Sequence, residues 1–379
     1  MKTLVKIFDK DYLKNGISSL ILNIECVYVL YHKYNEEAFN AFVKVINKKK
    51  PNLKISFYQY DDNIFNEFNT DDIIVDLYGG DDYIQLKVFE WCLNNNIQTI
   101  MVDIMKKEII KMHNADNLFL TYQNPKLSIQ DLLELTGAEI DNSLHKTPIL
   151  NNHEYNDSLV KIFDIVVDYG FDKYTEMCSL ITKDLISKNL IVGNNKTILS
   201  KSVDINLLRS LAIFNEFERK ELLQIQNRMI IYKNNEVFDL VRNAGLILEQ
   251  YLYLKLIESN YFDEVKMSVV IRKDYYNQKT HREIDLIVLK DLKLIFISCK
   301  MYAVNIQDVM EIKTHEEYFG NFLSSSALIC GQWLEKQNYN LYLRTKELYV
   351  YIVDKDEFKC HKAISDIRNI IEGTYQYDL

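Results

Sequence analysis

A chain of 379 residues, 48% hydrophobic and 26% charged, has enough material for two or three packed domains. Its formal net charge of -9 argues against a protein whose main task is to coat nucleic acid, because such proteins are usually basic. A nuclease is not excluded, since its metal ions supply positive charge of their own.

Cysteine usage and the lack of long apolar runs indicate the cellular compartment in which the protein works. The six cysteines form no CxxC pair, so the sequence favours neither a zinc ribbon nor a redox motif. The chain opens directly into a strand-like run, which is not typical of a secretory signal. No apolar segment reaches the roughly 18 residues that span a bilayer. We therefore expect a cytoplasmic protein without a membrane partner.

Strand and helix patterns alternate along residues 1–145. Such alternation predicts an α/β, Rossmann-like domain with a mostly parallel sheet and helices on both faces. The last predicted helix follows Pro125 and has Ser128 as a suitable N-cap. The expected strands are Thr3–Phe8, Cys26–His32, Leu53–Tyr58, Ile73–Leu77 and Gln98–Asp103, the expected helices are Asn15–Ile24, Glu36–Lys49, Asp81–Asn94 and Ile129–Thr136, and a hairpin is expected over Lys107–His113 and Asn117–Tyr122.

A polar stretch around Pro148 marks a domain boundary, and residues 146–227 read as a mainly helical connector. Within the connector, residues 189–199 have the pattern of two short strands around a Gly193-Asn194-Asn195 turn. Helices followed by such a hairpin are typical of a winged-helix module. A helical connector of another kind fits the same pattern.

Residues 228–379 form a second α/β region. A long amphipathic helix is expected from about Arg228 to Ser259, followed by strands and one further helix. The expected strands are Glu264–Arg272, Glu283–Leu289, Leu294–Cys299, Ser326–Cys330 and Leu348–Val353, with the helix over Ile306–Tyr318.

Two of these strands meet at a tight turn, and its register groups three polar residues. If Asp291 and Leu292 form a two-residue loop, Asp285 lies directly opposite Ser298 on one face of the sheet. Lys300, two residues further on, shares that face. The pattern therefore predicts an acid, a hydroxyl and a lysine together on an otherwise apolar hairpin.

Phosphodiester hydrolysis uses such a group. A carboxylate holds a divalent metal, and a lysine neutralises charge that develops on phosphorus. The window Lys266–Lys300 contains eight Lys or Arg residues against four Asp or Glu, which suits a phosphate backbone. An interpretation without function, in which the acid and the lysine are solvated residues at strand ends, fits these residues as well.

Glu249, Asp285 and Ser298-x-Lys300 together resemble the PD-(D/E)xK pattern of restriction-endonuclease-like nucleases. The resemblance implies that Glu249 and Asp285 bind Mn²⁺ or Mg²⁺ and that Lys300 helps to activate water. Ser298 stands where the family has its second acid, and serine is a poor ligand for a hard cation. Either Glu249 and water complete the metal shell, or the site is impaired. Gln307 and Glu311, on the following helix, either reach the site or face solvent.

The N-terminal region has its own candidate site, at the strand Ile73–Leu77, which runs through Tyr78, Gly79 and Gly80 into a helix. Ligands of open parallel sheets bind at strand ends, and helix N-termini favour anions. Glycines let a backbone approach a phosphate closely, although tight turns use Gly-Gly routinely.

The order of elements and domains resembles that of CRISPR ancillary nucleases with a CARF sensor domain. Asp76-Leu77-Tyr78-Gly79-Gly80 occupies the place of the family's Asn-x-Thr-Gly-Gly signature, and the segment from Pro125 to Leu133 resembles the one that closes that domain. The resemblance implies a homodimer that binds a cyclic oligoadenylate, most often the cyclic tetra-adenylate, across two sensor domains. The family often has Thr-Lys after Gly-Gly, where this chain has two acids. Lys87 is one residue whose contact with the ligand would compensate for the missing lysine. The implied ligand-binding residues are Asp9, Lys10, Tyr78, Gly79, Gly80, Asp81, Asp82 and Tyr83.

The resulting hypothesis has three parts: a sensor domain over residues 1–145, a connector over 146–227 and a nuclease domain over 228–379. Together they would form a cyclic-oligoadenylate-activated, metal-dependent nuclease of CRISPR antiviral defence that cleaves DNA, RNA or both without strong sequence specificity. A first alternative is a ligand-responsive winged-helix transcription regulator with a degenerate nuclease domain. A second is a ring nuclease that degrades its own activator.

Overall fold

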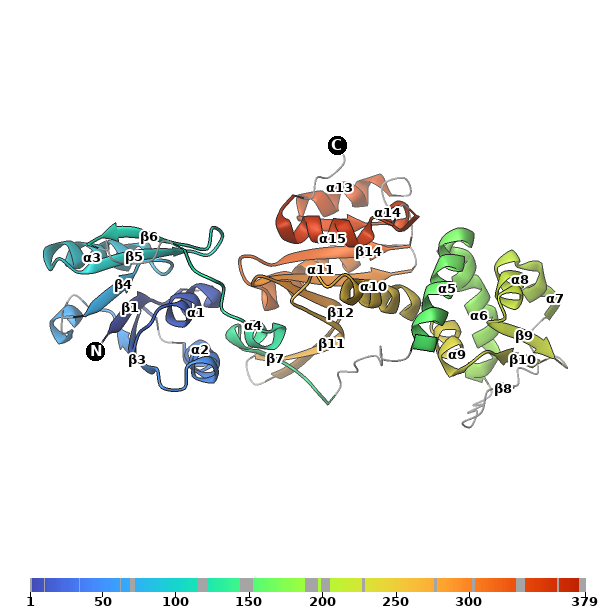
Figure 1. Ribbon diagram of the computed structural model, residues 1–379, viewed down its shortest axis with the longest axis horizontal. Helices are drawn as coiled ribbons and strands as arrows, with labels where there is room; N and C mark the ends of the chain where they lie inside the picture. The colour runs from blue at the N-terminus through green and yellow to red at the C-terminus, as the bar shows by residue number, and fades with distance from the viewer. Residues whose placement is uncertain are drawn as a thin grey trace. The chain divides into compact units, whose positions relative to one another are not determined.

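The computed structural model describes most of the chain: residues 2–9, 11–33, 35–61, 63–68, 72–114, 121–143, 153–187, 197–198, 205–226, 229–275, 278–301, 304–331, 338–359 and 361–374. Its contacts divide the chain into two compact units. Unit 1 comprises residues 1–140, 271–282 and 319–323, and unit 2 comprises residues 141–270, 283–318 and 324–379. The predicted α/β class is confirmed (Figure 1). Among the described residues, no helix is both long enough and apolar enough to cross a membrane.

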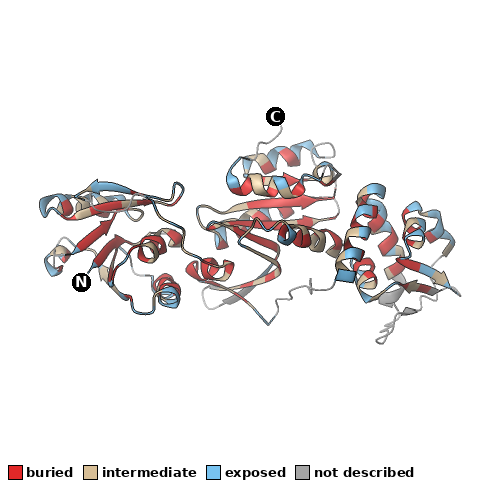
Figure 2. Cartoon of the chain, in the orientation of Figure 1, coloured by how far each residue is buried: buried red, intermediate tan, exposed pale blue. Residues whose placement is uncertain are grey.

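Unit 1 is built on a six-stranded sheet of β1 (Thr3–Ile7), β2 (Cys26–Tyr31), β3 (Lys54–Gln59), β4 (Ile73–Asp76), β5 (Gln98–Asp103) and β6 (Glu108–His113). The strand order is β3-β2-β1-β4-β5-β6 (Figure 1). All neighbours are parallel except β5 and β6. The central strands β1 and β4 are buried along their whole length (Figure 2), as expected of a sheet covered on both faces.

The helices of unit 1 follow from the strand order. The chain runs outward from β1 through α1 (Tyr12–Ile21), β2 and α2 (Glu36–Lys49) to β3, and outward in the other direction from β4 through α3 (Asp82–Asn94) to β5. Right-handed crossovers in opposite directions place their helices on opposite faces of a sheet. The α3 face is apolar: Val88 and Cys92 join the buried cluster that contains Val75.

The strand order reverses between β1 and β4, which are neighbours with their carboxyl ends at the same edge. Asp9 lies just beyond β1, and the segment Tyr78–Asp81 lies just beyond β4. In open α/β sheets this reversal is the place where ligands bind. The candidate sensor residues are therefore gathered at the switch point of the unit 1 sheet.

A second six-stranded sheet has the order β15-β14-β13-β12-β11-β7. Its strands are β7 (Ala138–Ile140), β11 (Glu264–Tyr275), β12 (Gln278–Lys290), β13 (Lys293–Lys300), β14 (Ser325–Cys330) and β15 (Val350–Val353). The short β7, which was not predicted, pairs with residues 271–273 of β11 within unit 1. The β12–β13 hairpin and the parallel pairs β13–β14 and β14–β15 belong to unit 2.

The helices of unit 2 pack into one hydrophobic core. Apolar residues of α5 (His153–Tyr169), α6 (Phe171–Ser187) and α8 (Ala212–Arg219) join the same buried cluster as those of α10 (Leu246–Glu258), β13 and α15 (Ala363–Glu372). A three-stranded antiparallel sheet of β8 (Thr197–Ile198), β10 (Met229–Tyr232) and β9 (Leu223–Gln226) accompanies α7 (Ile205–Ser210). A shared core does not define where a domain ends, so the predicted boundaries at 145 and 227 stay predictions.

The predicted helix from Arg228 to Ser259 is wrong. The structure has strand β10, then α9 (Asn235–Arg242), then α10. Asn234 starts α9 by accepting the main-chain N–H of Val237, and Asn243 leaves helical geometry at ψ 88°. Side-chain capping by asparagine thus overrides the continuous apolar pattern.

Other differences are smaller. Helix α1 begins at Tyr12 rather than Asn15, because the Asp11 carboxylate accepts the N–H of Leu13. The polar stretch before β15 contains α13 (Tyr339–Glu347), which Asn338 caps. The hairpin segments predicted at 117–122 and 189–199 lie largely outside the described residues.

Candidate active site and candidate sensor site

The β12–β13 hairpin has the predicted register. Lys290 pairs with Lys293, and Leu286 pairs with Ile297. Asp291 and Leu292 have positive φ angles of 50° and 74°, which two-residue hairpin loops require at both positions. This register brings Asp285 to Ser298.

The main-chain pairing of β12 with β13 ends next to Asp285, whose carboxylate is hydrogen-bonded to the opposite strand. Its Oδ2 accepts the Cys299 main-chain N–H at 2.7 Å and the Ser298 hydroxyl at 3.2 Å. Burial raises the pKa of Asp285, and these two hydrogen bonds and the Lys300 ammonium oppose that rise. Ser298 is therefore a donor that orients the aspartate.

Glu249 reaches this site from α10. Burial raises the pKa of the Glu249 carboxyl to about 8, and the carboxylates of Asp285 and Glu283 act in the same direction, while Lys300 lowers it. Two carboxyl groups that share a poorly solvated site resist simultaneous ionisation unless a cation joins them. The pair predicted from the sequence is thus brought together, in a setting that favours a positive ligand.

Lys300 lies at the end of β13, and its ammonium is held from the following helix. Lys300 Nζ is 3.4 Å from Asp308 Oδ1 on α11 (Ile306–Phe319). Asp308 Oδ2 accepts the Asn305 N–H at 2.9 Å, and the Asn305 side chain accepts the N–H of Asp308. This reciprocal cap fixes both the start of α11 and the position of the Lys300 counter-ion.

A cavity of about 70 Å³ opens at this point. It is lined by Glu283, Ile284, Asp285, Ile297, Ser298, Lys300, Glu311, Ile312 and His315. Of the two α11 side chains considered from the sequence, Glu311 lines the cavity, whereas Gln307 is exposed. His315, which is buried, was not predicted.

The carboxylates of this site bear on which divalent metal it could hold. Among the described residues no group of three or more His, Cys, Asp or Glu side chains is arranged to hold a metal ion. Glu249 and Asp285 supply two carboxylates, which suits a cation such as Mg²⁺ that keeps several of its waters. The residues present therefore fit a hydrated Mg²⁺ or Mn²⁺ and do not fit a closed, all-protein cage.

The candidate sensor site in unit 1 is organised by Asp9. Its Oδ2 accepts the Gly80 main-chain N–H at 2.6 Å, and its Oδ1 accepts that of Asp11 at 2.7 Å. One carboxylate thus ties the loop after β1 to the turn after β4. Gln85 completes the turn by donating to the Gly79 carbonyl at 2.9 Å.

Both glycines of the turn are required by its shape. Gly79 and Gly80 have φ angles of +93° and +96°, which side-chain-bearing residues rarely adopt. A Cβ at Gly79 would lie 2.6 Å from Asp9 Oδ2, and one at Gly80 only 2.2 Å from Ile7 Cγ2. The Gly-Gly pair therefore serves close backbone packing at the switch point.

The two acids that follow Gly80 in the sequence, Asp81 and Asp82, have different surroundings. Asp81 caps α3 by accepting the N–H groups of Tyr83 and Ile84, so its charge is used at the helix start. Asp82 and Tyr83 are exposed. Lys87 pairs with Glu90 on the same helix at 3.1 Å. Lys10 lies outside the described residues.

A buried ion pair lies beneath the switch point. Lys6 and Asp76 are fully buried, with Nζ and Oδ2 3.7 Å apart. Lys6 also donates to the Lys14 carbonyl and the Ser18 hydroxyl. Desolvation lowers the pKa of Lys6 to about 8, against the opposing effect of Asp76. Asp76 Oδ1 accepts the Tyr78 N–H, so the pair supports the start of the turn.

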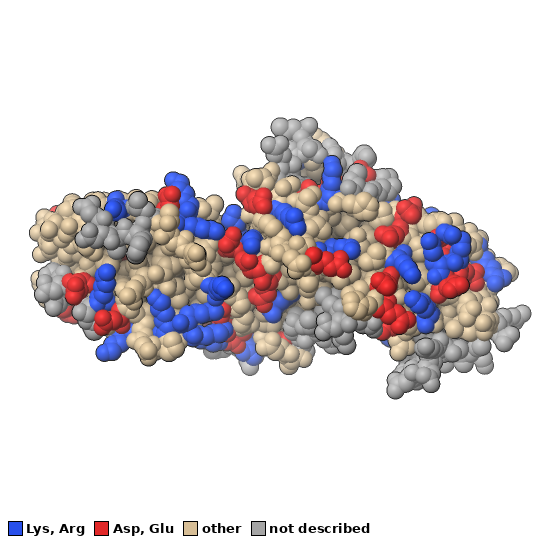
Figure 3. Space-filling view, viewed as in Figure 1, with Lys and Arg blue, Asp and Glu red and all other residues tan. Residues whose placement is uncertain are grey.

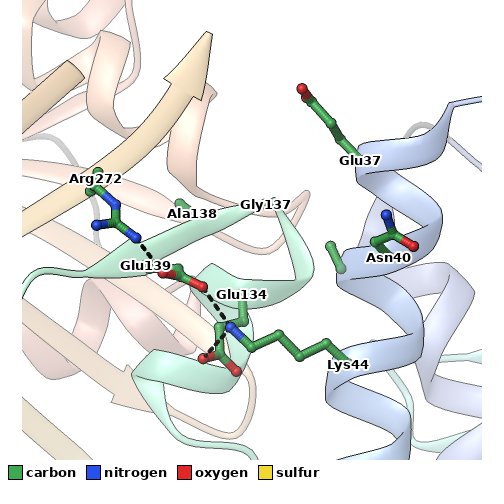
Figure 4. Close-up of a pocket in the computed structure, with 9 residues that line it drawn as sticks. Glu37, Asn40, Lys44, Glu134, Gly137, Ala138, Glu139 and Arg272 are labelled. Atoms are coloured by element: carbon green, nitrogen blue, oxygen red, sulfur yellow. Dashed lines mark hydrogen bonds and ion pairs between the residues drawn. The ribbon is translucent and has the colours of Figure 1, made fainter. Parts of the chain in front are cut away.

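A larger cavity of about 350 Å³ lies elsewhere in unit 1 (Figure 4). Glu139 bridges two cations there, Lys44 Nζ at 2.6 Å and Arg272 Nη2 at 2.9 Å, and Glu134 is 3.2 Å from Lys44. The figure shows Glu37 on α2, the helix that also carries Lys44, across from Glu139 and Arg272. Because both cations of the lining are paired with glutamates, we regard the cavity as a structural ion-pair junction between α2, β7 and β11.

Surface charge is mixed. On the face drawn in Figure 3, Lys and Arg side chains alternate with Asp and Glu side chains rather than gathering in one basic surface. This pattern agrees with the net charge of -9 and leaves polyanion binding to local sites.

Comparisons with known proteins show the fold. No family model and no curated protein matches the chain. The crystal structure of protein VC1899 from Vibrio cholerae matches with a TM-score of 0.77 at 14% identity, covering 98% of both chains. Can2 from Sulfobacillus thermosulfidooxidans, in complex with cyclic tetra-adenylate, matches with a TM-score of 0.69 at 16% identity, covering 98% of this chain and 97% of that one. This chain therefore has the fold of both proteins along nearly its whole length.

Sequence reasoning missed several residues around the two sites. Asp308 was readable, because the spacing Asn305-x-x-Asp308 just ahead of a helical pattern is a capping signal. His315 carries no local signal, since it enters the cavity through the packing of α11. Lys6 looked like an ordinary strand residue, and only the sheet topology shows that it is buried.

Proposed function

We propose that the protein is a metal-dependent nuclease that is switched on by a cyclic oligoadenylate in CRISPR defence. The supporting observation is that Asp285 and Lys300 line one small cavity, with Glu249 close enough to both for their charges to act on its pKa of about 8, and with Lys300 paired with Asp308. Perturbed carboxyl groups in a cleft are typical of functional sites. The likeness in fold to the cyclic tetra-adenylate complex of Can2 supports the activator.

In this proposal Glu249 and Asp285 hold one Mn²⁺ or Mg²⁺, and Glu249 gives up its proton as the cation binds. The chemistry that such a cation would supply when bound is polarisation of the scissile phosphate and a lowered pKa of water. Lys300 donates hydrogen bonds to the attacking water or to the phosphoryl oxygens. Ser298 holds Asp285 in its orientation, and Asp308 fixes the ammonium of Lys300.

The sensor half of the proposal is the switch point of unit 1. The Asp9–Gly80 turn presents Tyr78, Gly79 and the exposed Tyr83, and the cyclic ligand would lie across the turns of two protomers. Exposed aromatic side chains such as Tyr83 suit stacking on adenine. The restriction-endonuclease-like and CARF architectures, the homodimer and the nucleic-acid substrate all belong to this proposal.

A cleavage assay tests the proposal. Purified protein with Mn²⁺ or Mg²⁺ is mixed with supercoiled plasmid, single-stranded DNA or RNA, with and without cyclic tri-, tetra- or hexa-adenylate. We expect cleavage of at least one substrate only when metal and one activator are present. Omission of metal by EDTA treatment should abolish it. An absence of cleavage under every combination would contradict the nuclease assignment.

Matched lysine variants separate chemistry from folding. Lys300→Ala should reduce cleavage by at least about a hundredfold, the scale of removing one electrostatic or acid–base group. Lys313→Ala is the control: Lys313 pairs with Glu316 at 2.8 Å in the same unit but does not line the cavity. Equal activity in the two variants would remove Lys300 from the mechanism.

A second candidate is a ligand-responsive transcription regulator with a degenerate nuclease domain. Two observations favour it: the described residues contain no three-ligand metal group, and the sheet β8-β10-β9 stands beside the short helices α7 and α8. Sequence-specific binding of duplex DNA, without metal-dependent cleavage of any substrate, would decide for the regulator.

A further inference from the structure

Lys14, on the first turn of α1, has an unusual set of partners at the edge of the candidate sensor site. Its Nζ lies 5.4 Å from the ring centroid of Tyr78 and 5.2 Å from that of Phe322. Asp9 Oδ2 is 3.9 Å away, and about a quarter of the Lys14 side chain is exposed. The ammonium therefore lies beside the residues of the Asp9–Gly80 turn.

These partners hold Lys14 weakly. Cation–π contacts at such partly exposed positions are weak. The contact with Asp9 is long, and the same carboxylate oxygen already accepts the Gly80 N–H at 2.6 Å. A phosphodiester oxygen would offer Lys14 a short, charge-assisted hydrogen bond instead. Lys6, by contrast, is fully buried and has several polar partners.

An anionic ligand at this turn needs a cation. Burial raises the pKa of Tyr78 to about 12, and the carboxylates of Asp103, Asp11, Asp76 and Asp9 act in the same direction. So many acids near one tyrosine give the turn a negative potential that repels phosphate. Asp76 and Asp103 have cations of their own, Lys6 and Lys106, and Lys14 is the cation that lies against the Tyr78 ring.

Phe322 joins Lys14 to a different part of the chain. The Phe322 N–H donates to Asp11 Oδ2 at 2.7 Å, and its ring meets that of Tyr78 edge-on at 6.5 Å. The segment Phe319–Leu323 belongs to unit 1. The rest of α11, which precedes it, and the strand β14, which follows it, belong to unit 2. Helix α11 carries Asp308, the partner of Lys300.

We propose that Lys14 is a phosphate-binding residue of the sensor site. When the ligand captures Lys14, the segment Phe319–Leu323 is held less tightly, and this changes the position of α11, the helix that leads into it. The proposal rests on the proposed function, since it names the residue through which that activator would act. When Lys14 turns to the phosphate, the Tyr78 and Phe322 rings lose the cation that they share. The tether to Asp11 then holds the segment with one contact fewer.

The test measures binding and cleavage separately, with cyclic tetra-adenylate as the probe. Lys14→Gln should weaken binding by at least tenfold in calorimetric titration, and Lys14→Arg should stay within about threefold of the original chain. The control is Lys54→Gln, at an exposed position at the amino end of β3, which should also stay within threefold. Phe322→Ala should keep the binding affinity but lower the ratio of activated to basal cleavage by at least tenfold.

Hydrogen–deuterium exchange gives a readout that does not depend on cleavage. Amides of residues 319–323 should exchange faster once cyclic tetra-adenylate is bound, because the Phe322 contacts weaken. Unchanged affinity in Lys14→Gln, or an unchanged cleavage ratio in Phe322→Ala, would overturn the inference while leaving the proposed function intact. If the original chain binds no cyclic oligoadenylate at all, the sensor part of the proposed function fails, and this inference fails with it.

Discussion

Asp285 in unit 2 and Asp9 in unit 1 hold similar positions with different consequences. Asp285 accepts hydrogen bonds from Ser298 and Cys299, which lie 13 and 14 residues away across a two-residue loop. Asp9 accepts hydrogen bonds from Asp11 and from Gly80, and Gly80 lies 71 residues away. One carboxylate is positioned by a local hairpin, and the other by the order of strands in a parallel sheet.

The electrostatic settings differ as well. Burial raises the pKa values of Asp285 and Glu249, and neighbouring carboxylates add to the rise. Asp9 instead spends its two oxygens on main-chain N–H groups, and the turn that it organises is defined by shape. In the proposed function the first aspartate would hold a cation, whereas the second fixes the geometry of a loop.

The largest expected effect is the loss of cleavage in Asp285→Asn. The amide oxygen still accepts the Cys299 N–H, but it carries no charge for a metal ion. We expect activated cleavage to fall about a thousandfold, within the range found for a catalytic electrostatic group. Binding of cyclic tetra-adenylate and the free energy of unfolding should stay unchanged within about 1 kcal/mol. Residual activity above a tenth of the original would place the metal elsewhere.

The second prediction concerns the shape of the sensor turn. Gly80→Ala should lower the free energy of unfolding by about 3 kcal/mol, because a Cβ there meets Ile7 at 2.2 Å and the φ angle is strained. Gly137→Ala is the matched control: its φ is also positive, at +76°, but nothing lies within 4 Å of the added Cβ. The control should cost about 1 kcal/mol. Urea unfolding curves that show equal losses would mean that the close packing at Gly80 is not what fixes the turn.

The same contrast explains what could be predicted from the sequence. The hairpin register, and with it the meeting of Asp285 and Ser298, follows from turn length and alternation, which are local properties. The α/β class follows from alternating periodicity. The partnership of Asp9 with Gly80 required the strand order, which puts β1 beside β4. The prediction of one long helix at 228–259 was wrong, because capping by Asn234 and the non-helical backbone of Asn243 outweigh hydrophobic periodicity.

The third prediction concerns the hold on Lys300. In Asp308→Asn the amide can still accept the Asn305 N–H and cap α11, but Lys300 loses its counter-ion and is drawn toward Asp285 and Glu249. We expect the Mn²⁺ concentration for half-maximal cleavage to rise about tenfold, as for other residues that support a metal site. Asn305→Ala removes the cap without removing the charge, so it should lower stability by about 1 kcal/mol and leave the Mn²⁺ requirement unchanged. The reverse pattern would make Asp308 a helix cap and nothing more.

The last prediction concerns the pH dependence of stability in unit 1. The buried pair Lys6–Asp76 joins opposite charges there, whereas Asp285 and Glu249 are both acids. The folded pKa of Lys6 is about 8, below its ordinary value of 10.5, so the unfolded chain binds more protons between these values. Lys6 therefore makes the folded state more stable as pH rises from about 8 toward 10.5, by at most about 1.4 kcal/mol per pH unit. The double variant Lys6→Met, Asp76→Asn, which leaves no uncompensated buried charge, should lack this rise. Urea unfolding at pH 7.5, 8.5 and 9.5 measures the difference in slope between the two proteins, and parallel profiles would show that Lys6 keeps its proton when the chain folds.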